Sequence, residues 1–272
     1  MKLQKYIFVL FAVLLAVSCS KDDDVFFQSS QGEEEKNFTF SAAIDYGMRE
    51  AGEDRGLTRA VSATKDEAPT RCCMQAFSGG TAVTDVLTGT KNGNAYTFSV
   101  RLIPDTEYTC LFWADNDADA STPASLTNVS YTAGNVAFAA VVSGTPEAIS
   151  TAVTLKHVVT KLTLQTTAAA TIAEDAPLSI RTRCATTYNV LTSSADGATD
   201  CTVVQNISGS FAANENITSF YILPAGSKED VILDCHNSTQ TITAVPFSAN
   251  THITLKGDLS GDNGDKTETN NE

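Results

Sequence analysis

The clearest chemistry in this sequence of 272 residues belongs to a cysteine near its amino end. Cys19 follows an uncharged apolar run, residues 6–17, and two lysines precede that run. The run is shorter than the roughly 20 residues that cross a bilayer, so it indicates a secretory signal peptide and not a spanning helix. The small residues at 16–18 resemble the lipobox read by lipoprotein signal peptidase, with its usual leucine one place early at Leu15. We therefore predict a signal peptide at residues 1–18 and acylation of Cys19.

Acyl chains on Cys19 would hold the protein on a membrane without a spanning segment. Each buried acyl CH₂ contributes about 0.8 kcal/mol, and one chain alone anchors only marginally. Bacterial lipoproteins usually carry more than one chain, palmitate among them, so a stable anchor is expected. Residues 20–24 (SKDDD) resemble the acidic signal that exports lipoproteins to the outer face of some diderm bacteria, and a solvated spacer is the alternative interpretation. The prediction is a surface-exposed lipoprotein of the outer membrane, with the membrane as a partner.

Residues that could carry catalysis are few and dispersed. The three histidines stand at the edges of separate strand-like runs, and no nucleophile elbow, Walker loop, dinucleotide loop or zinc-helix motif accompanies them. A catalytic histidine needs a nucleophile or a carboxylate within reach, so we interpret His157 as a packed structural residue. The sequence assigns no catalytic residue, no ligand-binding residue and no cofactor, and it favours a protein that is not an enzyme. The histidines are His157, His236 and His252.

Residues 115–119 (DNDAD) begin like a calcium-binding loop. The EF-hand loop requires glycine at its sixth position and glutamate at its twelfth. Here those positions hold Ala120 and Leu126, which excludes an EF-hand and leaves a looser calcium site as an alternative. No spacing of cysteine and histidine suits zinc either, and we predict no metal site.

Six of the seven cysteines remain besides Cys19. An even number in an exported protein permits disulfides, but the sequence does not decide among the pairings. Cysteines within apolar strand-like runs are interpreted as small buried hydrophobes. Cys72 and Cys73 are adjacent, so on a strand only one of them is expected to face the core. The six are Cys72, Cys73, Cys110, Cys184, Cys201 and Cys235, of which Cys110, Cys184 and Cys235 lie inside apolar runs.

Acidic side chains dominate the charge of the chain. The formal net charge is −14, and it becomes −16 once the two lysines of the signal peptide are removed. This charge disfavours nucleic acid and anionic lipid as partners, and it suits solubility outside the cell. The roughly 250 residues that remain are enough to bury a core without metals or disulfides.

Short runs of alternating apolar and polar residues recur along the chain and predict β-strands. Stretches rich in glycine, asparagine and proline separate them, for example 78–80, 91–94, 194–197 and 224–226. Many short strands joined by such turns indicate an antiparallel all-β sandwich rather than βαβ units. The best helical candidate is 166–175, and a loop is equally compatible with it. The predicted strands are 38–43, 96–102, 107–113, 136–142, 158–165, 178–184, 201–207, 219–223, 231–235, 239–245 and 252–259.

Breaks in the strand pattern suggest how the chain is organised. Residues 19–36 are predicted to be the lipidated cysteine and an acidic tether, because nothing in the tether can be buried. A break with glycine and proline at 142–151 places a boundary between two β-sandwich domains, residues 37–150 and 151–259. Residues 260–272 contain no apolar side chain and are predicted to be a disordered polar tail.

The sole tryptophan lies in the strand-like run 108–115. Leu111 and Trp113 share one face of that run, and Cys110 and Phe112 share the other, so both faces are apolar. We therefore interpret Trp113 as a core residue. An exposed Trp113 would instead be a platform on which a glycan stacks.

Several segments together resemble the fimbrillin-like (Mfa-like) surface lipoproteins, the subunits of type V pili and their relatives. The order and spacing of the segments carry the resemblance, which spans most of the mature chain. The segments are the lipobox with its acidic continuation, 38–44 leading into 57–60 (LTRA), 108–115 ending in FWAD, 155–162 (LKHVVTKL), 220–224 (FYILP) and 250–259 (NTHITLKGDL).

The resemblance implies two transthyretin-like sandwich domains in tandem and a mechanism of assembly. In this family a protease cuts after an arginine that follows the first strand, the strand leaves, and a donor strand from a neighbouring subunit fills the groove. Arg59 matches that arginine, with Arg55 and Arg49 close by, and an arginine in an exposed acidic loop is the alternative. Polymerising subunits donate a strand from the carboxyl end, whereas this chain ends in a polar tail.

These features together predict a fimbrial tip or accessory subunit or an adhesin. Its expected partners are other pilus subunits and a host or glycan ligand. The alternative is a glycan-binding lipoprotein of a polysaccharide-uptake system. A glycan binder would display Trp113 or several tyrosines on one flat face, whereas a pilus component would have a removable first strand that covers a groove.

Overall fold

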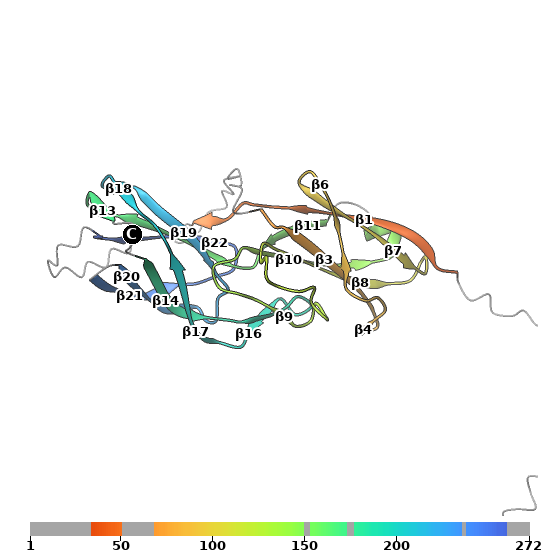
Figure 1. The fold of residues 1–272 in the computed structure, drawn as a ribbon. Coiled ribbons are helices and arrows are strands. Elements are labelled where there is room, and N and C mark those ends of the chain that lie inside the picture. Colours follow the sequence, from red (N-terminus) through yellow and green to blue (C-terminus); the bar gives the residue numbers. More distant parts are fainter. Residues whose placement is uncertain (1–33, 51–67, 150–152, 173–176, 236–237, 260–272) are drawn as a thin grey trace, which may run out of the picture. The chain divides into compact units, whose positions relative to one another are not determined.

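The computed structural model describes residues 34–50, 68–149, 153–172, 177–235 and 238–259. Apart from residue 34, these belong to one unit of the chain, Glu35–Glu272. They form strands almost throughout, together with one short helix, α1 (Pro146–Ile149) (Figure 1). The all-β sandwich class predicted from the sequence is confirmed. Within the described ranges, no helix is long and apolar enough to cross a bilayer.

A sheet of nine strands contains most of the first half of the chain. The rings of Phe98 on β7 and Phe112 on β8 meet at 5.7 Å, although β10, β11 and β1 separate these two strands in the sheet order. The sheet therefore folds over on itself and forms a sandwich. Its order is β4 (Thr81–Ala82), β3 (Arg71–Ser78), β8 (Tyr108–Asp115), β10 (Ala137–Gly144), β11 (Val153–His157), β1 (Lys36–Ile44), β7 (Ala95–Leu102) and β6 (Thr90–Asn92), with β5 (Leu87–Thr88) on β3.

The second half of the chain, together with two short strands from the first half, forms two four-stranded sheets and two smaller ones. One four-stranded sheet has the order β19 (Asn216–Ile222), β12 (Thr160–Thr166), β22 (Thr251–Gly257) and β2 (Arg49–Glu50). The other has the order β17 (Thr199–Gln205), β14 (Leu178–Cys184), β20 (Lys228–Cys235) and β21 (Ser238–Pro246). The smaller sheets are β13 (Ala170–Ile172) with β18 (Gly209–Phe211), and β16 (Ser194–Asp196) with β15 (Thr187–Asn189) and β9 (Val129–Ser130).

Buried apolar side chains fall into two clusters that meet near β12. The first cluster continues along the chain to Val159 and takes in a few later residues, and the second begins at Leu162. The domain limits 37–150 and 151–259 stay predictions, because the residues at the proposed boundary lie outside the described ranges. The strand directly after that boundary, β11, pairs with β10 and β1 of the first sheet.

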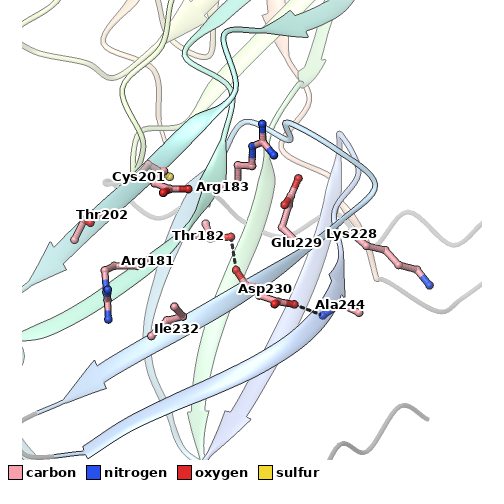
Figure 2. A pocket seen from close by; sticks show the side chains of 11 residues that line it. Arg181, Thr182, Arg183, Cys201, Thr202, Lys228, Glu229, Asp230, Ile232 and Ala244 are labelled. Carbon is pink, nitrogen blue, oxygen red and sulfur yellow. Dashed lines mark hydrogen bonds between the residues drawn. The ribbon is translucent and has the colours of Figure 1, made fainter.

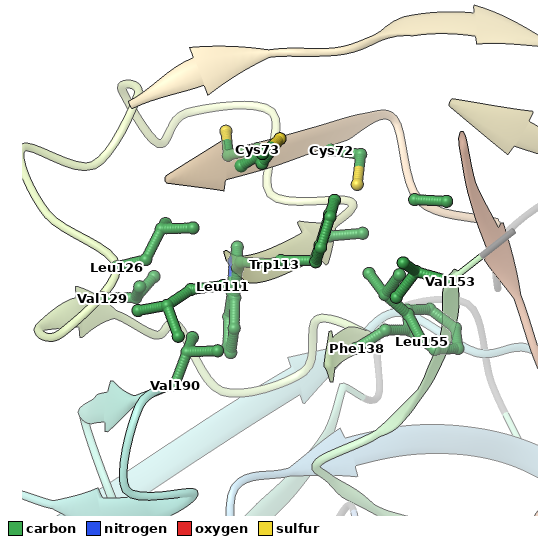
Figure 3. Close-up of a cluster of buried hydrophobic side chains, with 14 of the residues drawn as sticks. Cys72, Cys73, Leu111, Trp113, Leu126, Val129, Phe138, Val153, Leu155 and Val190 are labelled. Atoms are coloured by element: carbon green, nitrogen blue, oxygen red, sulfur yellow. The ribbon is translucent and has the colours of Figure 1, made fainter. Parts of the chain in front are cut away.

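Strand β8 is buried on both faces, as its apolar alternation predicts. Phe112 points into the sandwich, while Leu111 and Trp113 lie on the opposite face and are also fully buried. Later segments of the chain cover that opposite face, so the interpretation of Trp113 as a core residue is confirmed (Figure 3). The covering side chains include Leu126, Val129, Val190 and Tyr188, whose ring lies 5.6 Å from that of Trp113.

Part of this cover is formed by residues 185–200, here called the excursion, which run from the end of β14 through the first two residues of β17. The excursion contains β15 and β16, and β15 pairs with β9 of the loop that follows β8. The backbone N–H of Tyr131 donates to the carbonyl of Thr186 at 2.7 Å, and the Tyr131 hydroxyl donates to the carbonyl of Tyr221 at 3.0 Å. These hydrogen bonds therefore tie the loop after β8 to the excursion and to β19.

The predicted turns occur where glycine is needed. Gly79 and Gly80 have φ angles of 56° and 82° between β3 and β4, and Gly93 has 60° between β6 and β7, a region that side chains with a Cβ disfavour. The helical candidate at 166–175 is wrong in its described part. Residues 170–172 form β13, because pairing with β18 satisfies their backbone and buries two of their side chains.

Candidate functional site

The first strand of the fold occupies a slot between two other strands (Figure 1). β1 runs antiparallel to β7 over eight residue pairs, beginning with Lys36 opposite Leu102. On its other edge it runs parallel to β11 over three pairs, beginning with Ala42 opposite Val153. The carboxyl-terminal end of β1 is thus an inner strand, with backbone partners on both sides.

The side chains of β1 alternate as the sequence predicts. Phe40, Ala42 and Ile44 are buried, and the residues between them are partly exposed. Phe40 lies opposite Phe98 of β7, which touches the facing part of the sheet. Burial of Phe40 and Ile44 contributes roughly 3–6 kcal/mol to stability. Removal of β1 would therefore open an apolar groove flanked by the unpaired edges of β7 and β11.

A second contact holds the chain just after β1. Strand β2 pairs in parallel with β22, and the Arg49 N–H donates to the carbonyl of Asn250 at 3.0 Å. The His252 ring lies with Nδ1 2.8 Å from Glu50 Oε1 and with Nε2 2.8 Å from Thr163 Oγ1. Residues 36–50 are therefore held to the first cluster through β1 and to the last strand, β22, through β2.

The residues proposed for modification flank these two strands in sequence. Cys19, Arg55 and Arg59 lie outside the described ranges, and Arg49 is described and exposed on β2. The chain order is Cys19, β1, β2, the segment 51–67 with its two arginines, and then the remaining strands. A cut after Arg59 would therefore leave β1 and β2, with the residues before them, attached to the other strands only by non-covalent contacts.

An aromatic platform for a glycan is missing from the part of the chain that the structure describes. Trp113 is fully buried, and every described tyrosine except Tyr46 is at most 7% exposed. Tyr46 is half-buried, with its ring 5.7 Å from that of Phe138. The flat aromatic face expected of a glycan binder is therefore not found there. The described tyrosines are Tyr46, Tyr96, Tyr108, Tyr131, Tyr188 and Tyr221.

Asp115, the first residue of the calcium-like loop, is held by a guanidinium. Arg71 donates from Nε to Asp115 Oδ1 at 2.9 Å and from Nη2 to Oδ2 at 2.8 Å, and the Trp113 indole N–H also donates to Oδ2. Arg71 Nη1 donates to the carbonyls of Ala120 and Ser121 at 2.5 and 2.6 Å. Because a cation already occupies both carboxylate oxygens, the arrangement argues against the looser calcium site. The pair instead fastens the loop after β8 to β3.

The histidines have structural surroundings where they are described. His157 is buried, with its ring centroid 4.1 Å from that of Phe138 and 5.9 Å from that of Tyr221, which confirms the packed interpretation. His252 makes the contacts between β22, β12 and β2 given above. His236 lies outside the described ranges.

The adjacent cysteines of β3 face opposite ways, as neighbouring strand residues must. Both are nevertheless fully buried in the first cluster, so the expectation that only Cys72 or Cys73 would face a core is wrong. Cys73 lies opposite Trp113, on the face that later segments cover. Burial raises the pKa of the Cys72 and Cys73 thiols and raises that of Cys110 to about 12, so these thiols are poor nucleophiles.

An open hollow of about 500 Å³ lies over β14, β17 and β20 (Figure 2). Basic and acidic side chains line it in equal measure, and polar groups there bond to one another, as Thr182 does to the carbonyl of Asp230 at 2.9 Å. Because these charges balance, the lining of the hollow favours neither an anionic nor a cationic ligand. Its charged lining residues are Arg181, Arg183, Lys228, Asp200, Glu229 and Asp230.

One family model matches residues 29–267 of the chain. The matched family is described as a family of unknown function, DUF6562, and the match extends over most of the 272 residues. The protein therefore belongs to this family. No curated protein sequence matches the chain.

Several solved structures are similar to this one. A fimbrial assembly protein from Parabacteroides distasonis has 12% identity and a TM-score of 0.45, with 84% of this chain and 94% of that chain covered. A candidate cell adhesion protein from Bacteroides uniformis has 13% identity and a TM-score of 0.46, with coverages of 83% and 94%. A candidate adhesin from Bacteroides thetaiotaomicron has 8% identity and a TM-score of 0.48, with the same coverages. At these TM-scores the likenesses carry no conclusion about this chain.

The buried pair of Arg71 and Asp115 gives a prediction about stability. The side chains of this pair are 15% and 4% exposed, so Arg71→Ala leaves a buried carboxylate without its cation. The free energy of unfolding should fall by roughly 3–5 kcal/mol in urea denaturation.

The matched control is Arg181→Ala, which breaks the pair of Arg181 with Asp234 between neighbouring strands. The two side chains are 49% and 31% exposed, so the loss should stay below about 1 kcal/mol. Equal losses in the two variants would contradict a special role for the Arg71 pair.

Proposed function

We propose that the protein is a non-enzymatic, surface-exposed lipoprotein of the outer membrane that acts as a fimbrial tip or accessory subunit or as an adhesin. The observation that carries the proposal is the position of β1. This strand is the first of the fold, it stands between the lipidated cysteine and an arginine-bearing segment, and it fills a slot between β7 and β11. An element in that position can be separated from the other strands by a single cut.

Donor-strand exchange would use the slot in the following way. A protease cuts after Arg59, β1 and β2 dissociate, and the edges of β7 and β11 lose their backbone partners. An extended segment of a neighbouring subunit then pairs with those edges and places apolar side chains where Phe40, Ala42 and Ile44 were. Its binding is favourable because it satisfies the edge hydrogen bonds and refills the apolar groove in one step.

The slot of β1 supports the accepting role in assembly, as a tip or accessory subunit has it. A shaft subunit must both accept and donate a strand, and the slot accounts for acceptance. The partner is accordingly another pilus subunit that donates into this chain, and the lack of a described aromatic platform weakens the glycan-uptake alternative.

The anchor can be tested by metabolic labelling with palmitate. The wild-type protein should take up label and fractionate with the outer membrane, because Cys19 carries the acyl chains. Cys19→Ala should be unlabelled and absent from that fraction, while Ser20→Ala, the neighbouring control, should behave as wild type. Retention of an unlabelled Cys19→Ala protein on the outer membrane would refute the anchor.

The cut can be tested by mass spectrometry of protein shaved from intact cells. We expect a native amino terminus at Ala60 in the wild type and its loss in Arg59→Ala, because the protease requires the arginine side chain. Arg49→Ala, which changes an exposed arginine on β2, should leave the Ala60 terminus unchanged. If acylated Cys19 is the only amino terminus in the wild type, strand removal does not occur and an uncut adhesin remains.

A further inference from the structure

Two cysteines stand at the two ends of the 185–200 excursion. Cys184 is the last residue of β14, and Cys201 lies near the start of β17. These strands are antiparallel, with Thr182 opposite Cys201 and Cys184 opposite Thr199. Residues two apart on a strand share a face, so the two cysteines are diagonal neighbours on one face of the sheet.

The two thiols also contact each other and differ in exposure. The S–H of Cys201 donates a hydrogen bond to the sulfur of Cys184, which lowers the pKa of Cys184 and raises that of Cys201. Cys184 is buried, whereas Cys201 is partly exposed and lines the open hollow next to Arg183 (Figure 2). The Cys201 thiol is therefore accessible to solvent, whereas the Cys184 thiol that it contacts is buried.

The other four described cysteines have no cysteine opposite them on a neighbouring strand. Burial raises the pKa of Cys235, as it does for the thiols of β3 and β8. Cys235 lies opposite Leu178 on one side and Ser238 on the other, with no cysteine facing it across the sheet. Among the six described cysteines, the strand register singles out the pair at the base of the excursion.

We propose that Cys184 and Cys201 form a disulfide in the exported protein, which staples the base of the 185–200 excursion. The staple would hold in place the residues that cover the outer face of β8, including Tyr188 against Trp113. Export, which is part of the proposed function, supplies the oxidising setting for the bond in the cell, and the purified protein can be oxidised without it.

The oxidant is a disulfide compound, and the chemistry proceeds by two exchanges. Cys184 is the thiol that ionises first, and Cys201, which solvent reaches, passes its proton to the Cys184 sulfur through their hydrogen bond as it attacks one sulfur of the oxidant. The oxidant expels a thiolate, which takes up a proton from solvent, and a mixed disulfide forms on Cys201. Cys184 then loses its proton, attacks the Cys201 sulfur and expels the second thiolate of the oxidant, which takes up that proton. In sum, two cysteine thiols lose two hydrogen atoms, and the oxidant is reduced to two thiols.

The test treats the reduced, purified mature protein with oxidised glutathione, followed by alkylation and digestion without reductant. We expect two of the six thiols to escape alkylation and one linked peptide pair that joins Cys184 to Cys201. The melting temperature of the oxidised protein should exceed that of the reduced protein by roughly 5–10 °C, because the bond closes the loop of the excursion.

Variants sharpen the result. Cys201→Ser and Cys184→Ala should each abolish the linked pair and the rise in melting temperature, whereas Cys235→Ser, on the neighbouring strand β20, should keep both. The proposal is overturned if all six wild-type thiols are still alkylated, if the link joins another pair, or if glutathione stays on Cys201 without release. Peptide mapping of the wild type decides the matter even where a variant fails to fold.

Discussion

Backbone pairing of a strand that comes first in the chain is the constraint on which this fold depends. β1 joins β7 to β11 and so links the two parts of the folded sheet, and its apolar side chains fill the space between them. A sheet with that strand missing exposes two unpaired edges and a groove, which is an unstable arrangement in water. The same dependence makes β1 a suitable place for exchange, because whatever replaces it must restore both the hydrogen bonds and the burial.

The rest of the structure supports this slot from outside. β3 and β8 are buried on both faces, so the wall of the sandwich opposite β1 and β7 is covered by the loop after β8 and by the 185–200 excursion. This cover is fastened by the Arg71 pair with Asp115, by the pairing of β15 with β9 and by the hydrogen bond from the Tyr131 N–H. The proposed disulfide would add a further link at the base of the excursion. A wall fastened in this way would keep the groove in shape during the proposed strand exchange.

Local pattern predicted 11 of the 22 strands in the described ranges, all of them at least seven residues long, and was insufficient for long-range partners. The alternation at 178–184 predicts β14 with the bounds observed, and that at 96–102 misses β7 by one residue. Residues 71–78 gave no such signal, because both faces of β3 are buried and a polar residue, Gln75, stands inside it with its side chain bonded to the backbone of Leu126.

The same distinction holds for the site residues: local pattern predicted some of their features, and it could not predict contacts between residues far apart in the sequence. The position of β1 and the burial of Trp113 followed from alternation, whereas the pairing of Arg71 with Asp115 and of Glu50 with His252 joins residues 44 and 202 positions apart. Within the helical candidate, residues 170–172 form a strand instead, because they pair with β18, a partner that local pattern does not reveal.

The most direct test of the central claim is hydrogen–deuterium exchange of β1 in the intact protein. We predict that β1 exchanges as slowly as β8, that Phe40→Ala speeds its exchange at least about tenfold, and that Thr39→Ala does not. Exchange of wild-type β1 at the rate of an unfolded peptide would contradict the account.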